Sequence, residues 1–212
     1  MSVQIKIIPE EVRNIASTQQ NIAETIGNNV EQLTSATSLL SSAWDSATAS
    51  QMIELIEQIE NALKSVNKQA FDGASGLVEI ANLFESIDGN LDAPFGVVKI
   101  IDSVNMLKCP RVGGISWNTS FSGTIRIIPE DVRHVGELCN RVSTECQDIA
   151  DQWNSTLEQL QPVWEGNAAN KYYATCREVG SGLQDIWEAA DELANKLHLI
   201  ADRYEEIDNM LF

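Results

Sequence analysis

Two long stretches of the chain carry apolar residues at steps that alternate between four and three positions. The first runs from Met52 to Leu91 and the second from Tyr172 to Leu211. This spacing places the apolar side chains along one seam of a helix that supercoils with its neighbours. Gly73 falls on the first seam, where it indicates a close approach of another helix or a small kink. The pattern predicts two long helices that belong to a bundle.

A weaker helical pattern precedes each seam. In the first half of the chain it begins near Pro9, because proline suits the first turn of a helix, and it ends near Ser41. Its apolar residues fit one face, although Gln19 and Asn29 weaken that stripe. Residues 1–8 are predicted to be an extended lead-in. The two patterns together predict a helical hairpin.

The hairpin occurs twice, and each copy turns at a tryptophan. Trp164-Glu165-Gly166 lies where a proline, a glycine and an asparagine interrupt the periodicity, and a shift of 120 residues brings Trp44-Asp45-Ser46 onto it. The same shift aligns the segments Ile5–Arg13 and Ile125–Arg133, which differ only by conservative changes. A chance match would not hold this register without a gap, so the chain contains a duplicated hairpin.

The duplication predicts an all-α fold. A hairpin with an apolar seam on both helices leaves one side open, and a second hairpin closes it. We expect residues 1–91 and residues 125–212 to pack antiparallel as a four-helix bundle, within one chain or by exchange of hairpins in a homodimer. Residues 92–124 contain several prolines and glycines and are expected to be a linker.

Charge and composition narrow the possible partners. Hydrophobic residues make up 43% of the chain and aromatic residues 6%, which suits an aliphatic helical bundle better than a β-sandwich or barrel. The formal net charge is −17 and both repeats are acidic, so no nucleic acid or anionic membrane surface is expected as a partner. No stretch reaches the roughly 20 apolar residues of a membrane span, and the N-terminus lacks the pattern of a cleaved signal peptide.

The cysteines show neither a C-x-x-C motif nor the spacing of metal ligands. In a hairpin that turns near Trp164, Cys176 should face Trp153, which leaves Cys146 about 10 Å out of reach of Cys176. Free thiols are therefore expected at all four positions, Cys109, Cys139, Cys146 and Cys176.

Catalytic chemistry is not expected. His134 and His198 could meet near the open end of the second hairpin, beside Asp131, but they do not by themselves predict a metal site. No Ser/His/Asp constellation, phosphate-binding glycine loop or paired carboxylates stand out in the sequence. We predict no cofactor, no metal and no enzymatic activity.

These features resemble the small Trp-X-Gly (WXG) proteins of the type VII, or ESX, secretion system, also called ESAT-6-like proteins. Trp164-Glu165-Gly166 matches their turn, and Tyr204-Glu205-Glu206-Ile207-Asp208 matches the Tyr-x-x-x-Asp/Glu export signal that many of them carry. The first copy departs from the pattern, with Ser46 in place of glycine and Phe84 and Asp88 in place of the Tyr and Asp of the signal. It is similar to the degenerate partner of a pair.

The resemblance implies a non-enzymatic protein that is exported folded, without a cleaved signal peptide, as a type VII substrate or co-secreted partner. It implies recognition through Tyr204, Asp208 and the turn residues, with a type VII secretion ATPase or a co-secreted protein as partner. If the copies pack antiparallel, each turn lies beside the end of the other copy. Trp44 would then be near Tyr204 and Asp208. By the same packing, Trp164 would be near Phe84 and Asp88.

Other interpretations remain open at this point. Trp44 and Trp164 could simply fill the ends of a bundle, and Tyr204 could be a core residue of the seam. The chain could be a cytoplasmic helical adaptor or chaperone whose apolar stripe binds the helices of another protein. A metal-dependent enzyme built on a helical bundle would need metal retained on purification.

Overall fold

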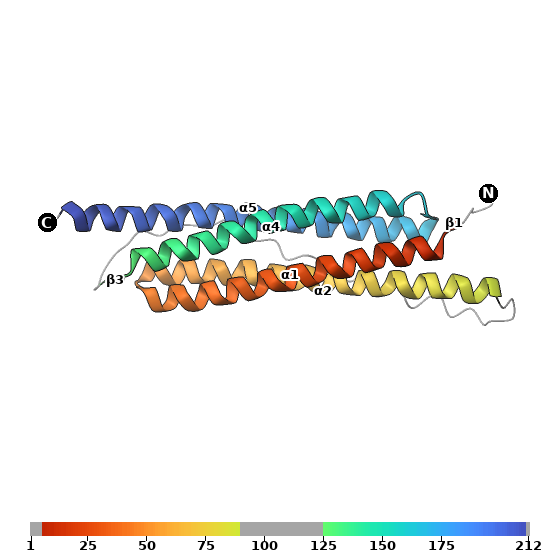
Figure 1. Cartoon of the computed structure of the whole chain (residues 1–212), viewed down its shortest axis with the longest axis horizontal. Coiled ribbons are helices and arrows are strands. Elements are labelled where there is room, and N and C mark those ends of the chain that lie inside the picture. The colour runs from red at the N-terminus through yellow and green to blue at the C-terminus, as the bar shows by residue number, and fades with distance from the viewer. Residues whose placement is uncertain (1–5, 90–124, 211–212) are drawn as a thin grey trace. The chain divides into compact units, whose positions relative to one another are not determined.

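A computed structural model describes residues 6–89 and 125–210 (Figure 1). The elements in chain order are β1 (Lys6–Ile7), α1 (Pro9–Ala43), β2 (Trp44–Asp45), α2 (Ala47–Gly89), β3 (Arg126–Ile127), α4 (Pro129–Leu160), β4 (Trp164–Glu165) and α5 (Asn167–Met210). The predicted all-α fold is confirmed: within these ranges the chain forms two helical hairpins. In each hairpin, a turn that contains a tryptophan connects the two helices. The predicted linker, residues 92–124, lies outside the described residues.

The helices begin where the sequence predicts. Both hairpins start at a proline, Pro9 or Pro129, whose missing N–H costs nothing in the first turn. Glu10 and Glu11 follow in α1, where they favour the positive end of the helix dipole. The first helix ends at Ala43, two residues beyond the predicted Ser41.

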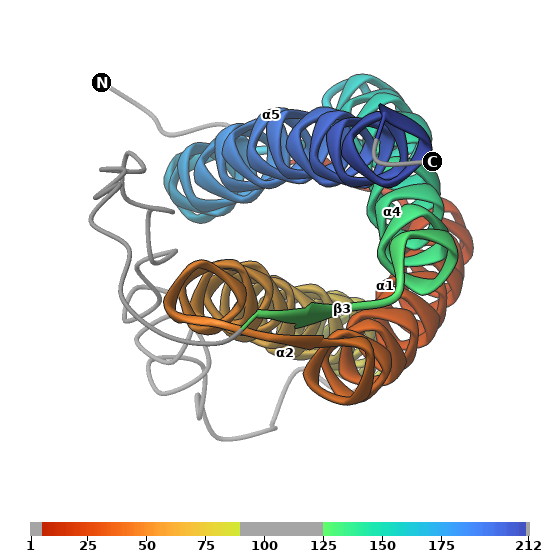
Figure 2. The same cartoon turned by 90° about the vertical axis from the view of Figure 1, so that its left-hand side faces the viewer.

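Each lead-in strand pairs with the turn of the other hairpin. The antiparallel pair β1 and β4 joins Ile7 to Trp164, and the antiparallel pair β2 and β3 joins Trp44 to Ile127. Figure 2 shows β3 lying beside the turn between α1 and α2. The extended lead-in was predicted from the sequence, but its pairing with the turn of the other hairpin was not. These short ladders fix which hairpin end lies beside which turn.

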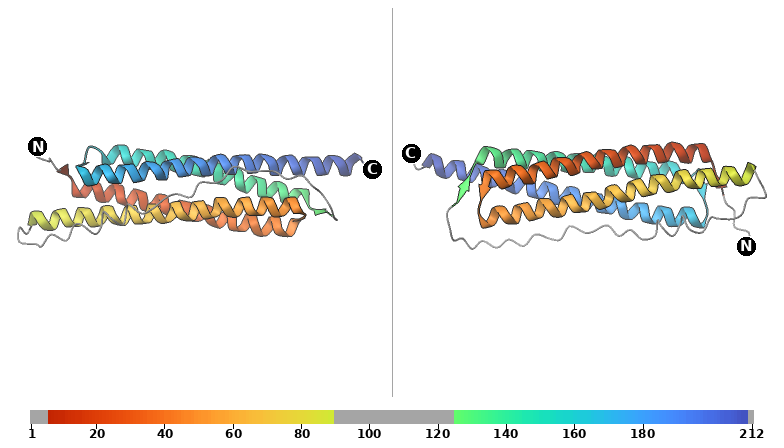
Figure 3. Two further views of the ribbon diagram at one scale, coloured as in Figure 1. Left: turned by 180° about the vertical axis from the view of Figure 1, so that it is seen from behind. Right: turned by 90° about the horizontal axis from the view of Figure 1, so that it is seen from below.

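The described residues divide into two units. Unit 1 contains residues 6–26, 65–89 and 149–182, and unit 2 contains residues 27–64, 125–148 and 183–210. Unit 1 therefore combines the beginning and end of the first hairpin with the turn of the second, and Figure 3 shows the start of α1 beside the turn between α4 and α5. Unit 2 combines the turn of the first hairpin with both ends of the second. In each unit the two hairpins run antiparallel, as predicted.

The predicted seams form the core of each unit. In α2 the seam residues from Met52 to Leu77 are at most 1% exposed wherever a side chain is present, and in α5 those from Tyr172 to Leu197 are at most 3% exposed. The seam ends before the helix does. Ile207 was expected on the seam but is 54% exposed, because the last turns of α5 extend past the packed segments.

Gln19 and Asn29 do not weaken the stripe of α1, and that expectation was wrong. Both side chains are fully buried, and both are hydrogen-bonded across to the second hairpin. A buried amide is tolerated where its donors and acceptors are satisfied. These two residues belong to the core.

Candidate functional site

The turn between α4 and α5 is built around a cluster of three aromatic rings. Trp164 is 2% exposed, and its ring centroid lies 5.6 Å from that of Tyr172 and 6.2 Å from that of Tyr173. The Tyr173 hydroxyl donates to the carbonyl of Leu160 at 3.2 Å and also bonds the carbonyl of Trp164. The cluster locks α5 to the end of α4. The sequence predicted Tyr172 as a seam residue, whereas no role was predicted for Tyr173.

The two turns use different backbone solutions at their third position. Gly166 has a φ of 131°, which residues with a side chain rarely adopt, and α5 begins directly after it. Ser46 keeps a negative φ and caps α2 instead, since its hydroxyl oxygen accepts the N–H of Ala49 at 3.0 Å. The serine that departs from the Trp-X-Gly pattern therefore has a structural role of its own.

Trp44 lies at the turn of the first hairpin and is 3% exposed. Its backbone pairs with Ile127, and the N–H of Ile128 donates to the carbonyl of Ala43 at 2.9 Å. Within the described residues the buried indole Nε1 of Trp44 has no hydrogen-bond acceptor. Both turn tryptophans are thus buried, as expected for residues that fill the end of a bundle.

A surface groove of about 490 Å³ lies beside this turn in unit 2. One wall is the end of α5, and the other is β3 with the first residues of α4. The lining residues are Ile127, Ile128, Pro129, Glu130, Tyr204, Glu205, Ile207 and Asp208. Tyr204 is half-buried, whereas Ile207 and Asp208 are exposed. The groove therefore offers an aromatic ring, an apolar side chain and a carboxylate to solvent.

An arginine clamps the end of α5 beside the groove. Arg133 donates to Glu205 through Nη1 at 2.9 Å and through Nη2 at 2.8 Å, and to Asp202 at 2.9 Å. Hydrogen bonds from Arg133 lower the pKa of the Glu205 carboxyl below its usual value. The clamp holds the helical turn that carries Tyr204.

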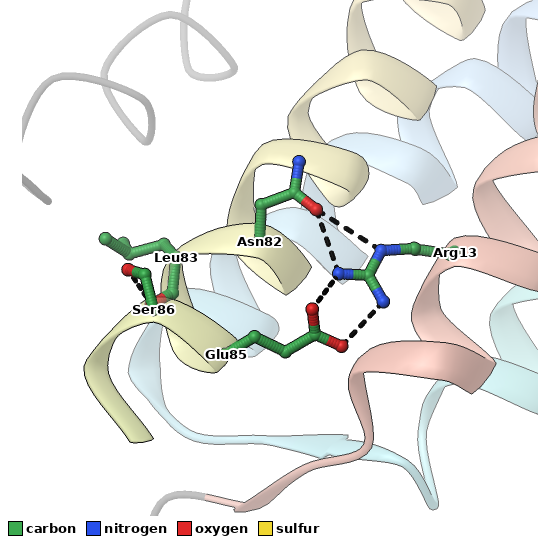
Figure 4. Close-up of polar contacts among 5 residues, drawn as sticks. All are labelled: Arg13, Asn82, Leu83, Glu85 and Ser86. Carbon is green, nitrogen blue, oxygen red and sulfur yellow. Dashed lines mark hydrogen bonds and ion pairs between the residues drawn. The ribbon is translucent and has the colours of Figure 1, made fainter. Parts of the chain in front are cut away.

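The corresponding clamp occurs in unit 1 at positions 120 residues earlier. Arg13 donates to Glu85 through both terminal nitrogens and to Asn82 through Nε at 3.3 Å and Nη2 at 2.9 Å (Figure 4). The hydrogen bonds from Arg13 likewise lower the pKa of Glu85. The adjacent Phe84 is half-buried, as Tyr204 is. The two ends thus share one framework and differ in the side chain that they present.

The predicted site residues fall into two groups. Ile127 links the first group, since it pairs with Trp44 and lines the groove together with Tyr204 and Asp208. The second group, the Trp164 turn and Phe84, belongs to unit 1, and the side chain of Asp88 lies outside the described residues. The contribution of residues 127–130 was missed. The duplicated Ile-Ile-Pro-Glu segment was the available signal, because it recurs at the same distance from both turns.

The three cysteines that the structure describes are free and buried, namely Cys139, Cys146 and Cys176. Burial raises the pKa of each thiol to about 12. The indole Nε1 of Trp153 donates to the carbonyl of Cys176 at 2.8 Å, so Cys176 faces Trp153 as predicted. Cys109 lies outside the described residues.

The two histidines have separate neighbours. His134 lies 3.2 Å from Glu137, and the ring of His198 lies against Gly136, where an added Cβ would meet it at 3.1 Å. In residues 6–89 and 125–210, no group of three His, Cys, Asp or Glu side chains is placed to hold a metal ion. None of the helices in these ranges is long and apolar enough to cross a membrane.

Comparison with known families identifies the family to which the chain belongs. The WXG100 family, described as proteins of 100 residues with WXG, matches twice, at residues 4–89 and residues 124–209. A search of curated proteins finds no sequence that matches the chain. The two matches contain the two tryptophan turns and cover most of the chain, which therefore belongs to the WXG100 family, small ESAT-6-like proteins associated with type VII secretion, as a tandem of two family units.

Proposed function

We propose that this protein is a non-enzymatic type VII secretion substrate, or a co-secreted partner, that carries both halves of a family pair in one chain. Residues 1–91 and 125–212 would be the two modules, joined by residues 92–124. The two hairpins complement one another in both units, which supports a chain that supplies its own partner. A type VII secretion ATPase or a co-secreted protein would bind it.

One observation carries the proposal. Tyr204 and Asp208, which match the export motif, line a groove together with Ile127, the residue that pairs with Trp44. A receptor that enters this groove would therefore contact the Tyr204 motif and strand β3, both in the second repeat. Strand β3 is in turn held in place by the Trp44 turn of the first repeat. The groove presents the ring and the carboxylate on a helix that Arg133 clamps, so little ordering of the site is needed before binding.

The first copy supplies the contrast. Phe84 occupies the position of Tyr204 and lacks its hydroxyl, although the Arg13 clamp beside it is preserved. We therefore infer that the end of unit 2 is recognised and that the end of unit 1 mainly holds the hairpins together. Two variants at matched positions can separate these roles.

The test is export of the full chain in a host with a type VII system. Tyr204→Ala and Asp208→Ala should reduce the protein in the culture filtrate at least tenfold while its level inside the cells stays the same. The matched control is Phe84→Ala, which removes a half-buried ring at the corresponding position and should leave export near the wild-type level. Circular dichroism of each purified variant checks that the fold is kept.

Either of two outcomes would contradict the proposal. Export of Tyr204→Ala at the wild-type level would show that the groove is not the signal. Retention of the wild-type chain inside the cells would favour the cytoplasmic adaptor, and co-purification with a helical partner would then be the next measurement.

A further inference from the structure

A chain of buried hydrogen bonds connects the two hairpins in unit 1. The Tyr172 hydroxyl donates to Gln19 Oε1 at 2.6 Å, and Gln19 Nε2 donates to the Thr156 hydroxyl at 3.3 Å. The Thr156 hydroxyl then donates to the carbonyl of Trp153 at 2.7 Å. All these side chains are at most 3% exposed. The buried side-chain amide of Gln19, in the first hairpin, is thus hydrogen-bonded to residues of the second hairpin.

A glycine makes room for this network. A Cβ added at Gly73 would lie 3.2 Å from the Tyr172 hydroxyl and 3.9 Å from Gln19 Oε1. Gly73 is on the seam of α2, where the neighbouring seam positions carry larger apolar side chains. The glycine predicted to mark a close approach therefore receives the tyrosine ring of the other hairpin.

The same place in unit 2 has different chemistry. The 120-residue offset that relates the copies also maps the ranges of unit 1 onto those of unit 2. The counterparts of Gln19, Gly73, Thr156 and Tyr172 are, in that order, Cys139, Leu193, Ala36 and Met52. All four counterparts are at most 1% exposed. In unit 1 a hydrogen-bonded polar pair, Gln19 and Tyr172, thus lies beside a glycine. In unit 2 the corresponding residues are smaller or apolar, and a leucine takes the place of the glycine.

Pairing of two identical hairpins would disrupt the packing around Gln19 in unit 1 and around its counterpart Cys139 in unit 2. Two first hairpins would bring Gln19 against Met52 and leave the buried amide without a partner, which is strongly unfavourable. Two second hairpins would bring Tyr172 against Leu193, where the glycine that admits its ring is missing. Only unlike hairpins satisfy the hydrogen bonds and the volumes together.

A second buried amide has the same arrangement. In unit 2, Asn29 Nδ2 donates to the thiol of Cys146 at 3.8 Å, and Asn29 Oδ1 accepts from Gln32 at 3.2 Å. The counterpart of Cys146 in the first hairpin is Ile26, which could not accept a hydrogen bond. Pairing of two first hairpins would therefore remove the acceptor of Asn29 Nδ2 in addition to the partners of Gln19.

We propose that the Gln19–Tyr172–Gly73 cluster selects the partner: a first hairpin accepts a second hairpin and rejects its own kind. Association between chains through these faces is then restricted to reciprocal exchange, in which the first hairpin of one chain binds the second hairpin of another. This proposal explains how the two hairpins of the proposed function recognise one another. It rests on the proposed function only for the pairing of the two hairpins. Thermal stability tests it, and no secretion is needed.

The test rebuilds the unit 2 residues inside unit 1 of the full chain. Gly73→Leu alone should lower the Tm by roughly 3–10 °C, because it forces a leucine onto the Tyr172 ring. Tyr172→Met alone should also lower the Tm, since Gln19 loses its donor. The triple variant, with Gln19→Cys added to both changes, recreates the unit 2 residues at three of the four positions and should melt above either single variant. Such recovery is direct evidence that the three positions are coupled.

A control and a gentler variant complete the series. Ser75→Leu adds the same side chain at an exposed position two residues along α2 and should change the Tm little. If Gly73→Leu does not fold, Gly73→Ala replaces it, since even the added Cβ would lie 3.2 Å from the Tyr172 hydroxyl. A triple variant that melts no higher than the more stable of the two single variants would overturn the proposal.

Pairing itself can be measured on the wild-type chain. Equal amounts of ¹⁴N- and ¹⁵N-labelled chains are refolded together from urea and cross-linked between lysines and carboxylates. Links within one chain, or mixed-isotope links between unlike hairpins, are the expected result. Mixed-isotope links between two first hairpins and between two second hairpins, as abundant as those between unlike hairpins, would overturn the selection. Loss of export in Tyr204→Ala would not affect either result, so the two proposals fail separately.

Discussion

Replacement of Trp164 by alanine should destabilise the protein severely. The indole is 2% exposed and packs against the rings of Tyr172 and Tyr173, so the substitution leaves a cavity next to two aromatic neighbours. Removal of a buried tryptophan costs about 3–5 kcal/mol of unfolding free energy. For a chain of this size, that loss corresponds to a fall in Tm of about 10 °C.

Trp44, at the turn of the first hairpin, is the matched comparison for Trp164. Trp44 is 3% exposed, but it has no aromatic ring partner among the described residues. Because ring pairs contribute about 0.5–1.5 kcal/mol beyond burial, Trp164→Ala should cost more than Trp44→Ala by about that amount. Urea unfolding followed by circular dichroism measures both, since it does not depend on the tryptophan signal. A loss below about 1 kcal/mol in Trp164→Ala would refute the packing role of the turn.

Further predictions concern the turns, the thiols and the clamp. Gly166→Ala should cost about 1–2 kcal/mol because its φ is 131°, and Ser46→Ala should cost about 1 kcal/mol through loss of the helix cap, both measured by urea unfolding. Burial raises the pKa of the three described thiols from 9.0 to about 12. Their contribution to stability is therefore full below pH 9 and should fall as the pH rises towards 12. At pH 8 a thiol reagent should label at most one of the four cysteines until the chain unfolds. Hydrogen bonds from Arg133 lower the pKa of Glu205, so their stabilisation is present above the usual carboxyl pKa and is lost as the pH falls; Arg133→Ala should flatten the acid limb of the Tm profile, less so at high salt.

Much of the fold could be predicted because the helical hairpin occurs twice in the sequence. The four-three spacing of α2 and α5 identifies the buried seams, and the 120-residue offset identifies a hairpin that must be closed by its copy. Antiparallel packing then brings the Trp44 turn to the same end as Tyr204. Burial of Trp153 opposite Cys176 followed from the position of the turn alone.

The missed features depend on contacts that no periodicity encodes. Gln19 reads as a flaw in an apolar stripe until Tyr172 of the other hairpin supplies its donor. The strand pairs at the turns involve two residues each, too few for a pattern along the chain to reveal. Exposure of Ile207 follows from where the other segments of unit 2 end, which the seam of α5 cannot indicate.

The most direct test of the account is a cross-link between the turn of one repeat and the lead-in of the other. Asp45 and Arg126 are partners in the antiparallel pair of β2 and β3, a separation within reach of a disulfide. The variant Asp45→Cys/Arg126→Cys should form this bond on mild oxidation, with the linked peptide identified by mass spectrometry. The control variant Asp45→Cys/Lys6→Cys should remain reduced under the same conditions. A bond in the control and none in the first variant would contradict the antiparallel pairing on which the fold, the groove and the proposed export role depend.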